Sequence, residues 1–205
     1  MAAATRTGTA GIILAAGASR RMGIAKPLLQ LPDGRRLLEV QFDTLRSGGC
    51  SPVLVVLGYQ WERVVRVLPA GVRWVFNPAW ERGRFSSVTA GLRVLPGFQG
   101  YVLLPVDTVG VAPATVARVL KFAGERLPLA VRPTWQGASG KMMWISPRLA
   151  RMLIRLGRLR DEFRLDHFFD RVSARLEAGD PAVLNNINTP ADWRHYLAEI
   201  ASGIH

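Results

Sequence analysis

The sequence predicts an α/β protein with three layers and a doubly wound, mostly parallel sheet. Short, continuous apolar runs, which are typical of strands buried on both faces, alternate with segments whose apolar residues recur at helical spacing. A basic loop with several glycines follows the first apolar run directly, and open α/β sheets bind their ligands at such carboxyl ends of strands. The alternation favours right-handed strand–helix–strand crossovers.

In the first half of the chain, strands are expected at residues 11–16, 52–57 and 72–76, where apolar and β-branched residues run without interruption. Helices are expected at residues 36–45, where two glycines follow as a stop, and at residues 60–68. Asn77-Pro78 closes the third strand, and Ser86 or Ser87 is expected to cap a helix that runs to Leu95.

In the second half, a strand at residues 101–107, a helix at 113–125 and a strand at 129–132 continue the alternation. Residues 146–175 are expected to be helical in two pieces separated near Gly157, because their leucines and phenylalanines are spaced like the inner stripe of a helix. Residues 185–188 are expected to be extended. A helix then follows, with Thr189 as its cap, Pro190 in its first turn and Asp192 adding favourable charge.

Length and composition fit a single domain. The chain has 205 residues, of which 49% are apolar. We expect residues 1–9 to be a flexible lead-in and residues 10–205 to form the domain. The single cysteine, Cys50, cannot form an internal disulfide, and neither a membrane span nor a signal peptide is recognisable. These features predict a cytoplasmic protein.

The strong positive charge requires an explanation. The formal net charge is +12, and such an excess indicates either anionic partners or simply a basic surface. The arginines are scattered over predicted helices and no nucleic-acid-binding motif is present, so nucleic acid is not expected as a partner. A nucleoside triphosphate and a phosphorylated co-substrate are equally anionic.

The loop after the first strand has the chemistry of a polyphosphate site. Gly17 and Gly23 permit backbone conformations that turn N–H groups towards an anion, and Arg20, Arg21 and Lys26 place cations in the same loop. The spacing excludes both a G-x-G-x-x-G fingerprint and a Walker-type G-K-[ST] loop. We therefore expect a different kind of phosphate cradle at the carboxyl end of the first strand.

Asp107 follows the fourth apolar strand directly, where it can face the first loop across the sheet. A carboxylate in that place is a suitable ligand for Mg²⁺ bridging phosphate oxygens. The alternative is a helix cap or a loop carboxylate paired with an arginine.

Three stretches carry a resemblance to a known family. The string LAAGASRRMGIAKPLL, at residues 14–29, resembles the signature L-A-[AG]-G-x-S-x-R-M-G-x-x-K of the nucleotidyltransferase superfamily that includes the molybdenum cofactor cytidylyltransferases and guanylyltransferases. The segments NPAWERGRFSSVTAGL and NNINTPADW resemble later motifs of the same family. The resemblance implies a Rossmann-like nucleotide-diphospho-sugar transferase fold.

The resemblance also implies roles for individual residues. Arg21, Lys26 and Asp107 are expected to be catalytic, and Asp107 and Asn188 are expected to hold Mg²⁺, with Asn188 supplying a neutral amide oxygen. The residues expected to bind the nucleotide are Leu14, Ala15, Ala16, Gly17, Ser19, Arg20, Lys26, Ser86, Ser87, Gly91 and Asp107.

The implied reaction is transfer of a nucleoside monophosphate, with CMP favoured, from an NTP to the phosphate of a molybdopterin-type acceptor with release of pyrophosphate. The implied partners are CTP or GTP, molybdopterin, and a molybdoenzyme or its chaperone, with neither nucleic acid nor membrane. Guanylyl transfer, a sugar-phosphate acceptor and a nucleotide-binding regulator stay open as alternatives. The motif R-G-H-P-[VA] of cytidylyltransferases is replaced by Gly140-Lys141-Met142, so Lys141 is interpreted either as an anion contact or as a solvated lysine at a strand edge.

Overall fold

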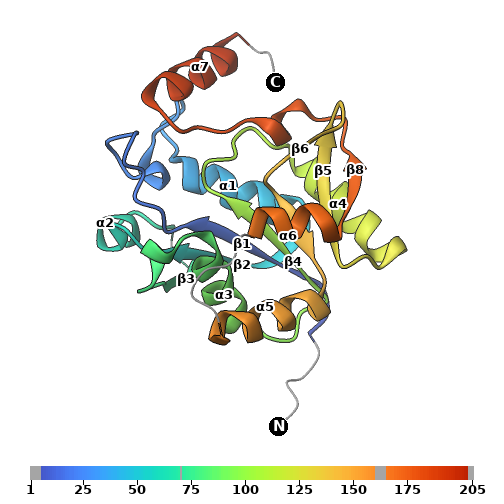
Figure 1. Ribbon diagram of the computed structural model, residues 1–205. Helices are drawn as coiled ribbons and strands as arrows, with labels where there is room; N and C mark the ends of the chain where they lie inside the picture. The colour runs from blue at the N-terminus through green and yellow to red at the C-terminus, as the bar shows by residue number, and fades with distance from the viewer. Residues whose placement is uncertain (1–5, 70, 160–164, 203–205) are drawn as a thin grey trace.

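The structure, a computed structural model, describes residues 6–69, 71–159 and 165–202 (Figure 1). The first strand, β1, begins at Thr9, inside the segment expected as a lead-in. Just before it, the backbone N–H of Arg6 donates to the carbonyl of Gly97 at 2.8 Å. Residues 1–5 lie outside the described residues.

The described residues form one eight-stranded, mostly parallel sheet in the order β3-β2-β1-β4-β7-β5-β6, with β8 paired to β5. The strands are β1 (Thr9–Ala15), β2 (Cys50–Leu57), β3 (Arg73–Phe76), β4 (Gly100–Pro105), β5 (Ala130–Trp135), β6 (Ala138–Ser139), β7 (Met143–Ile145) and β8 (Ser173–Glu177). Strands β1 to β4 pair in parallel, whereas β7 runs antiparallel to both β4 and β5. The predicted fold class is confirmed.

Helices cover both faces of this sheet, as Figure 1 shows. The helices are α1 (Leu37–Ser47), α2 (Trp61–Val65), α3 (Arg84–Val94), α4 (Pro113–Arg126), α5 (Pro147–Leu159), α6 (Leu165–Val172) and α7 (Pro190–Ala201). Short 3₁₀ helices occur at η1 (Lys26–Leu28), η2 (Trp80–Arg82) and η3 (Pro181–Leu184). Apolar residues of α1, α4 and α7 belong to one core cluster, and those of α3, α5 and α6 belong to a second. The sheet is therefore the middle of three layers.

The side chains of β1 explain why its sequence is a continuous apolar run. Ile12 and Ile13 are both fully buried, but they belong to different core clusters. Successive side chains of a strand point to opposite faces, so a strand between two helical layers needs an apolar residue at every position. The same reason applies to β2 and β4, which are also buried over most of their length.

Two expectations about the second half of the chain are corrected. The two expected helical pieces are present as α5 and α6, but α5 continues through Gly157 to Leu159. Gly157 instead lets α5 approach α3, since a Cβ there would lie 2.8 Å from Cγ2 of Thr89. Residues 173–175, expected as helix, begin β8, because pairing with β5 satisfies their backbone groups there. Residues 160–164, also within the expected helical stretch, lie outside the described residues.

The expected start of α3 is wrong. The helix begins at Arg84 after Gly83, whose φ of 88° suits glycine, and neither Ser86 nor Ser87 is its cap. The single O–H of Ser86 instead faces the carbonyls of Ala79 and Gly83, each 2.8 Å from its Oγ. The start of α7 agrees with the prediction, because Thr189 and Asp192 form a capping box there.

Within the described residues, no helix has the combination of length and apolar character needed to cross a membrane.

Candidate functional site

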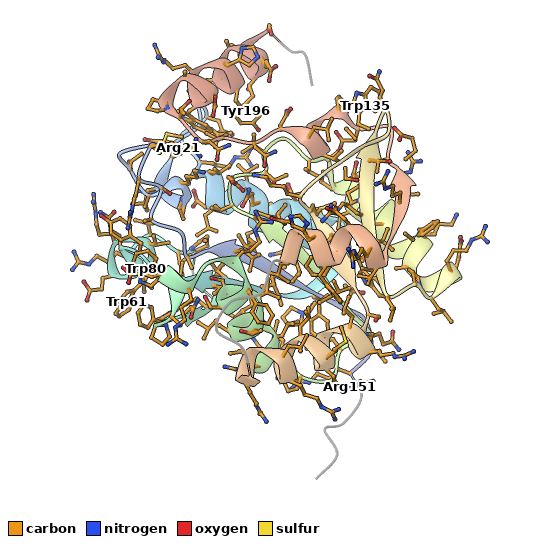
Figure 2. All side chains as sticks on the ribbon, viewed as in Figure 1. Arg21, Trp61, Trp80, Trp135, Arg151 and Tyr196 are labelled. Atoms are coloured by element: carbon orange, nitrogen blue, oxygen red, sulfur yellow. The ribbon has the colours of Figure 1, made fainter. Side chains whose placement is uncertain are left out.

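Loops that follow β1 and β4 meet at the carboxyl edge of the parallel strands, as expected for a doubly wound sheet. Together with residues near the start of α3, they surround a cavity of about 210 Å³. Figure 2 shows Arg21 and Trp80 on this side of the molecule, whereas Arg151 of α5 lies at the opposite end. The cavity is lined by Leu14, Ala16, Gly17, Ser19, Lys26, Trp80, Gly83, Arg84, Ser87, Pro105, Val106 and Asp107.

The loop after β1 is held in shape by Ser19, which has a left-handed backbone with φ of 50°. Its carbonyl accepts a hydrogen bond from the N–H of Met22 at 2.8 Å, and its hydroxyl oxygen accepts one from the N–H of Lys26 at 3.3 Å. Met22 is buried and anchors the loop on the core. The loop thus delivers Lys26, the first residue of η1, to the cavity.

Lys26 and Asp107 form an ion pair in the cavity wall. Nζ of Lys26 lies 3.7 Å from Oδ2 of Asp107, and the side chains are 11% and 19% exposed. Burial lowers the pKa of Lys26, the charge of Asp107 opposes that effect, and the charges of Lys141 and Arg21 lower the pKa further. A partly buried cation with positive neighbours is a strong site for a polyanion.

The loop that carries Asp107 is fixed by a buried glutamine of α1. Nε2 of Gln41 lies 3.4, 2.9 and 2.7 Å from the carbonyl oxygens of Pro105, Val106 and Thr108. Gln41 is only 4% exposed, so these contacts are shielded from water. Asp107 is therefore presented by a rigid turn at the end of β4.

The segment before α7 passes beside this turn. The N–H of Ile187 donates to the carbonyl of Asp107 at 2.8 Å, and Ile187 is buried while Asn186 and Asn188 are partly exposed, as expected for an extended segment. Asn186 donates to the carbonyl of Leu184, whereas the amide oxygen of Asn188 accepts from Nζ of Lys26 at 3.4 Å. Lys26 is thus bracketed by oxygens of Asp107 and Asn188.

These oxygens suit a hard divalent cation. Asp107 supplies a carboxylate and Asn188 a neutral amide oxygen, and both already surround one cation, the ammonium of Lys26. Among the described residues, no three or more His, Cys, Asp and Glu side chains are grouped to hold a metal. One carboxylate oxygen and one amide oxygen fit a divalent cation that takes few protein ligands and completes its shell with water and phosphate oxygens.

The structure brings together only some residues of the predicted nucleotide site. Leu14, Ala16, Gly17, Ser19, Lys26, Ser87 and Asp107 line the cavity, whereas Ala15, Arg20, Ser86 and Gly91 do not. Ala15 packs into the core cluster on the α1 side, because neighbouring strand residues face opposite ways. Gly91 lies on the inner face of α3, where a Cβ would approach Cγ2 of Ile12 to 2.9 Å.

Ser86 and Arg20 also lie outside the lining of this cavity. The Ser86 hydroxyl is taken up by Ala79, Gly83 and the side-chain amide of Asn77, so Ser86 fixes the local backbone. Arg20 and Arg21 are exposed and do not line the cavity. The charge of Arg21 nevertheless acts on Lys26 and on Asp192, whose pKa is lowered mainly by the N–H groups of Asn188 and Thr189.

Sequence reasoning missed five residues that line the cavity, namely Trp80, Gly83, Arg84, Pro105 and Val106. Gly58 lets Trp80 pack against the loop after β1, because a Cβ there would lie 2.5 Å from the carbonyl oxygen of Ala16 and 2.6 Å from Cβ of Trp80. The signal was present in the segment NPAWERG, whose tryptophan and glycine match the family motif.

The chain has the three-layer α/β fold with a mostly parallel sheet that solved nucleotidyltransferases also have. The chain belongs to the family of MobA-like NTP transferase domains, whose model matches residues 11–176.

The relatives that match this chain carry diverse names. The chain is 38% identical over 129 residues to the bifunctional IPC transferase and DIPP synthase of Rubrobacter xylanophilus, covering 58% of this chain and 28% of that protein. It is 35% identical over 111 residues to nicotine blue oxidoreductase of Paenarthrobacter nicotinovorans, covering 54% of each. It is 33% identical over 99 residues to a probable molybdenum cofactor guanylyltransferase of Rhodopirellula baltica, covering 47% of each. The matches therefore span between 28% and 54% of the length of these relatives.

Solved structures share the fold over nearly the whole chain. Rv0371c of Mycobacterium tuberculosis, also solved as a complex with manganese, is 24% identical with a TM-score of 0.76, covering 95% of this chain and all of that one. The molybdopterin-guanine dinucleotide biosynthesis protein A of Archaeoglobus fulgidus is 19% identical with a TM-score of 0.74, covering 94% and 98%.

Proposed function

We propose that the protein transfers CMP from CTP to the phosphate of a molybdopterin-type acceptor and releases pyrophosphate. Membership of the MobA-like family supports nucleotidyl transfer, and the relative named as a probable molybdenum cofactor guanylyltransferase supports the acceptor class. The observation that carries the proposal is the Lys26–Asp107 pair in the wall of a cavity that the glycine loop also lines.

Each wall of the cavity has a role in this proposal. The triphosphate lies against the loop of residues 16–26, where backbone N–H groups and Lys26 neutralise it. The nucleoside lies towards Trp80 and Ser87, whose hydroxyl is oriented by a 3.1 Å hydrogen bond from the Asn77 amide. Arg21, at the exposed side of the loop, stabilises the departing pyrophosphate through its charge.

The reaction needs positioning more than proton transfer. A phosphate group is already anionic near neutral pH, so one of its oxygens attacks the α-phosphorus without a general base. The bond from the α-phosphorus to the bridging oxygen breaks, and pyrophosphate leaves with that electron pair. The chain contributes by fixing both phosphates in place and by countering their charge. Magnesium, held by Asp107 and Asn188 when bound, supplies further charge neutralisation at the phosphate oxygens.

A nucleotide panel tests the proposal. CTP, GTP, ATP and UTP are added with Mg²⁺, binding is followed by thermal shift, and pyrophosphate release is then measured with molybdopterin as the acceptor. We expect CTP to raise Tm most and to support release. A larger effect of GTP would assign the protein to the guanylyl branch, which the Rhodopirellula relative's name favours. If no triphosphate changes Tm or releases pyrophosphate, the proposal is wrong.

A further inference from the structure

Asp107 contacts a second lysine that the proposed nucleotide site does not use. Nζ of Lys141 lies 3.3 Å from Oδ2 of Asp107, the same oxygen that faces Lys26 at 3.7 Å. Lys26 and Asp107 both line the nucleotide cavity, but Lys141 does not. Two lysines thus share one carboxylate oxygen, and only one of them, Lys26, lines the cavity.

The backbone around Lys141 is firmly held. The N–H of Gly140 donates to the carbonyl of Pro133 at 2.9 Å, and a Cβ on Gly140 would lie 2.5 Å from the carbonyl oxygen of Val183. Met142, on the other side of Lys141, is fully buried. The turn between β6 and β7 therefore delivers this one side chain to Asp107, while about one third of it (33%) is exposed.

The position of Lys141 is suited to an incoming anion. Resting on the proposed function, a divalent cation at Asp107 takes up the negative charge that now faces the Lys141 ammonium. The Lys141 ammonium is then partly exposed and its charge is no longer neutralised by Asp107. A phosphate is a strong partner for such an ammonium. Lys141 is not among the residues that line the cavity assigned to the nucleotide, so it is available for the second reactant.

We propose that Lys141 binds the phosphate of the acceptor, so that Lys26 and Lys141, which share Oδ2 of Asp107, hold the two reacting phosphate groups next to each other. In the transfer, the acceptor oxygen held by Lys141 forms the new bond to the α-phosphorus. The bond from that phosphorus to the pyrophosphate oxygen breaks, and no proton or electron is exchanged with the lysine. The acceptor class that this subsite selects is a compound with a terminal phosphate monoester.

The test uses inorganic phosphate as the probe. The full chain is saturated with Mg²⁺ and α,β-methylene CTP, whose carbon bridge blocks transfer and whose presence fills the nucleotide site. Phosphate is then titrated in and its binding is measured by calorimetry for the unchanged chain, Lys141→Met and Lys141→Arg. The matched control is Lys121→Met, which removes an exposed lysine of α4 whose ammonium lies 4.0 Å from Glu125.

We expect saturable phosphate binding to the unchanged chain, to Lys141→Arg and to Lys121→Met. Lys141→Met should weaken it by at least about tenfold, since one hydrogen bond to a charged group is lost. Equal phosphate affinity in Lys141→Met and the unchanged chain, with the CTP analogue bound to both, overturns the Lys141 assignment alone. Equal loss in Lys121→Met also overturns it, because the effect would then come from net charge. Failure of the unchanged chain to bind the analogue overturns the proposed function as well.

Discussion

Nζ of Lys26 donates a hydrogen bond of 3.4 Å to the amide oxygen of Asn188, a residue 162 positions further along the chain. This contact joins the glycine loop after β1 to the segment that precedes α7, and the same ammonium lies 3.7 Å from Asp107. Three distant segments of the chain therefore converge on one cation.

Lys26→Ala should abolish most nucleotide binding and turnover while leaving the fold intact. The Lys26 ammonium lies 3.7 Å from Asp107 in the cavity wall, and loss of one oriented charge of this kind lowers the rate by about 10²–10³. The measurements are pyrophosphate release, the Tm increase with CTP, and circular dichroism for the fold. Lys121→Ala, on the exposed face of α4, is the control and should behave like the unchanged chain. A Lys26→Ala variant that turns over at nearly the normal rate would refute the assigned role.

Asp107→Asn should weaken divalent-ion binding while the protein stays folded. The substitution keeps the shape of the side chain but removes the charge that faces Lys26 and Lys141. Mn²⁺ binding, followed by electron paramagnetic resonance, should weaken by at least about tenfold. Asp33→Asn, which changes an exposed carboxylate paired with Arg35, serves as the control. Unaltered Mn²⁺ affinity in Asp107→Asn would show that the ion binds elsewhere.

Gln41→Leu should lower turnover without contacting any substrate. The side-chain amide of Gln41 meets the carbonyl oxygens of Pro105, Val106 and Thr108, and leucine leaves these buried acceptors without it. We expect a loss of about 1–3 kcal/mol in the free energy of unfolding. The rate at saturating CTP should also fall, because the Asp107 turn is no longer fixed. Denaturant unfolding and steady-state kinetics check both effects; wild-type values of both would contradict the anchoring role.

Gly91→Ala should destabilise the protein although α3 is a helix and alanine is a better helix former. The added Cβ would lie 2.9 Å from Cγ2 of Ile12 and 3.0 Å from Cγ2 of Val56, so the helix must move off the sheet. Such overpacking costs about 1–3 kcal/mol. Gly124→Ala in α4 is the matched control: nothing lies within 4 Å of the place its methyl group would take, and it should stabilise by about 0.5–1 kcal/mol. Urea unfolding of both variants measures the change in the free energy of unfolding, which should be negative for Gly91→Ala and positive for Gly124→Ala.

Cys50 should be unreactive in the folded protein. Burial raises the pKa of its thiol from 9.0 to about 12, so the folded state keeps the proton between those values while the unfolded state releases it. The unfolded state then binds fewer protons, and the contribution of Cys50 to stability is complete below pH 9 and is lost as the pH rises towards 12. Ellman's reagent at pH 8 should react only after unfolding in guanidinium chloride. Rapid reaction of the native chain would contradict this burial.

Local patterns were sufficient for much of the fold. The sequence predicted strands β1, β2 and β4 because a strand buried on both faces needs consecutive apolar residues. It predicted the start of α7 because a helix cap is formed by residues that are neighbours in the chain. The prediction of helix at residues 173–175 was wrong because these residues pair with β5, a strand much earlier in the chain. Local helical spacing cannot reveal such a distant partner.

The candidate site was likewise predictable from the sequence only in part. The amino-acid sequence by itself determined that a glycine-rich cationic loop and an acid follow two buried strands, because strand ends and loop chemistry are encoded in neighbouring residues. Only the tertiary structure decided that Lys26 and Lys141 meet at Asp107, that Asn188 contacts Lys26, that Trp80 lines the cavity, and that Ala15 and Gly91 do not. The physical reason is that these relations depend on which strands pair and which face each side chain takes, and both are settled by packing between residues far apart in the chain.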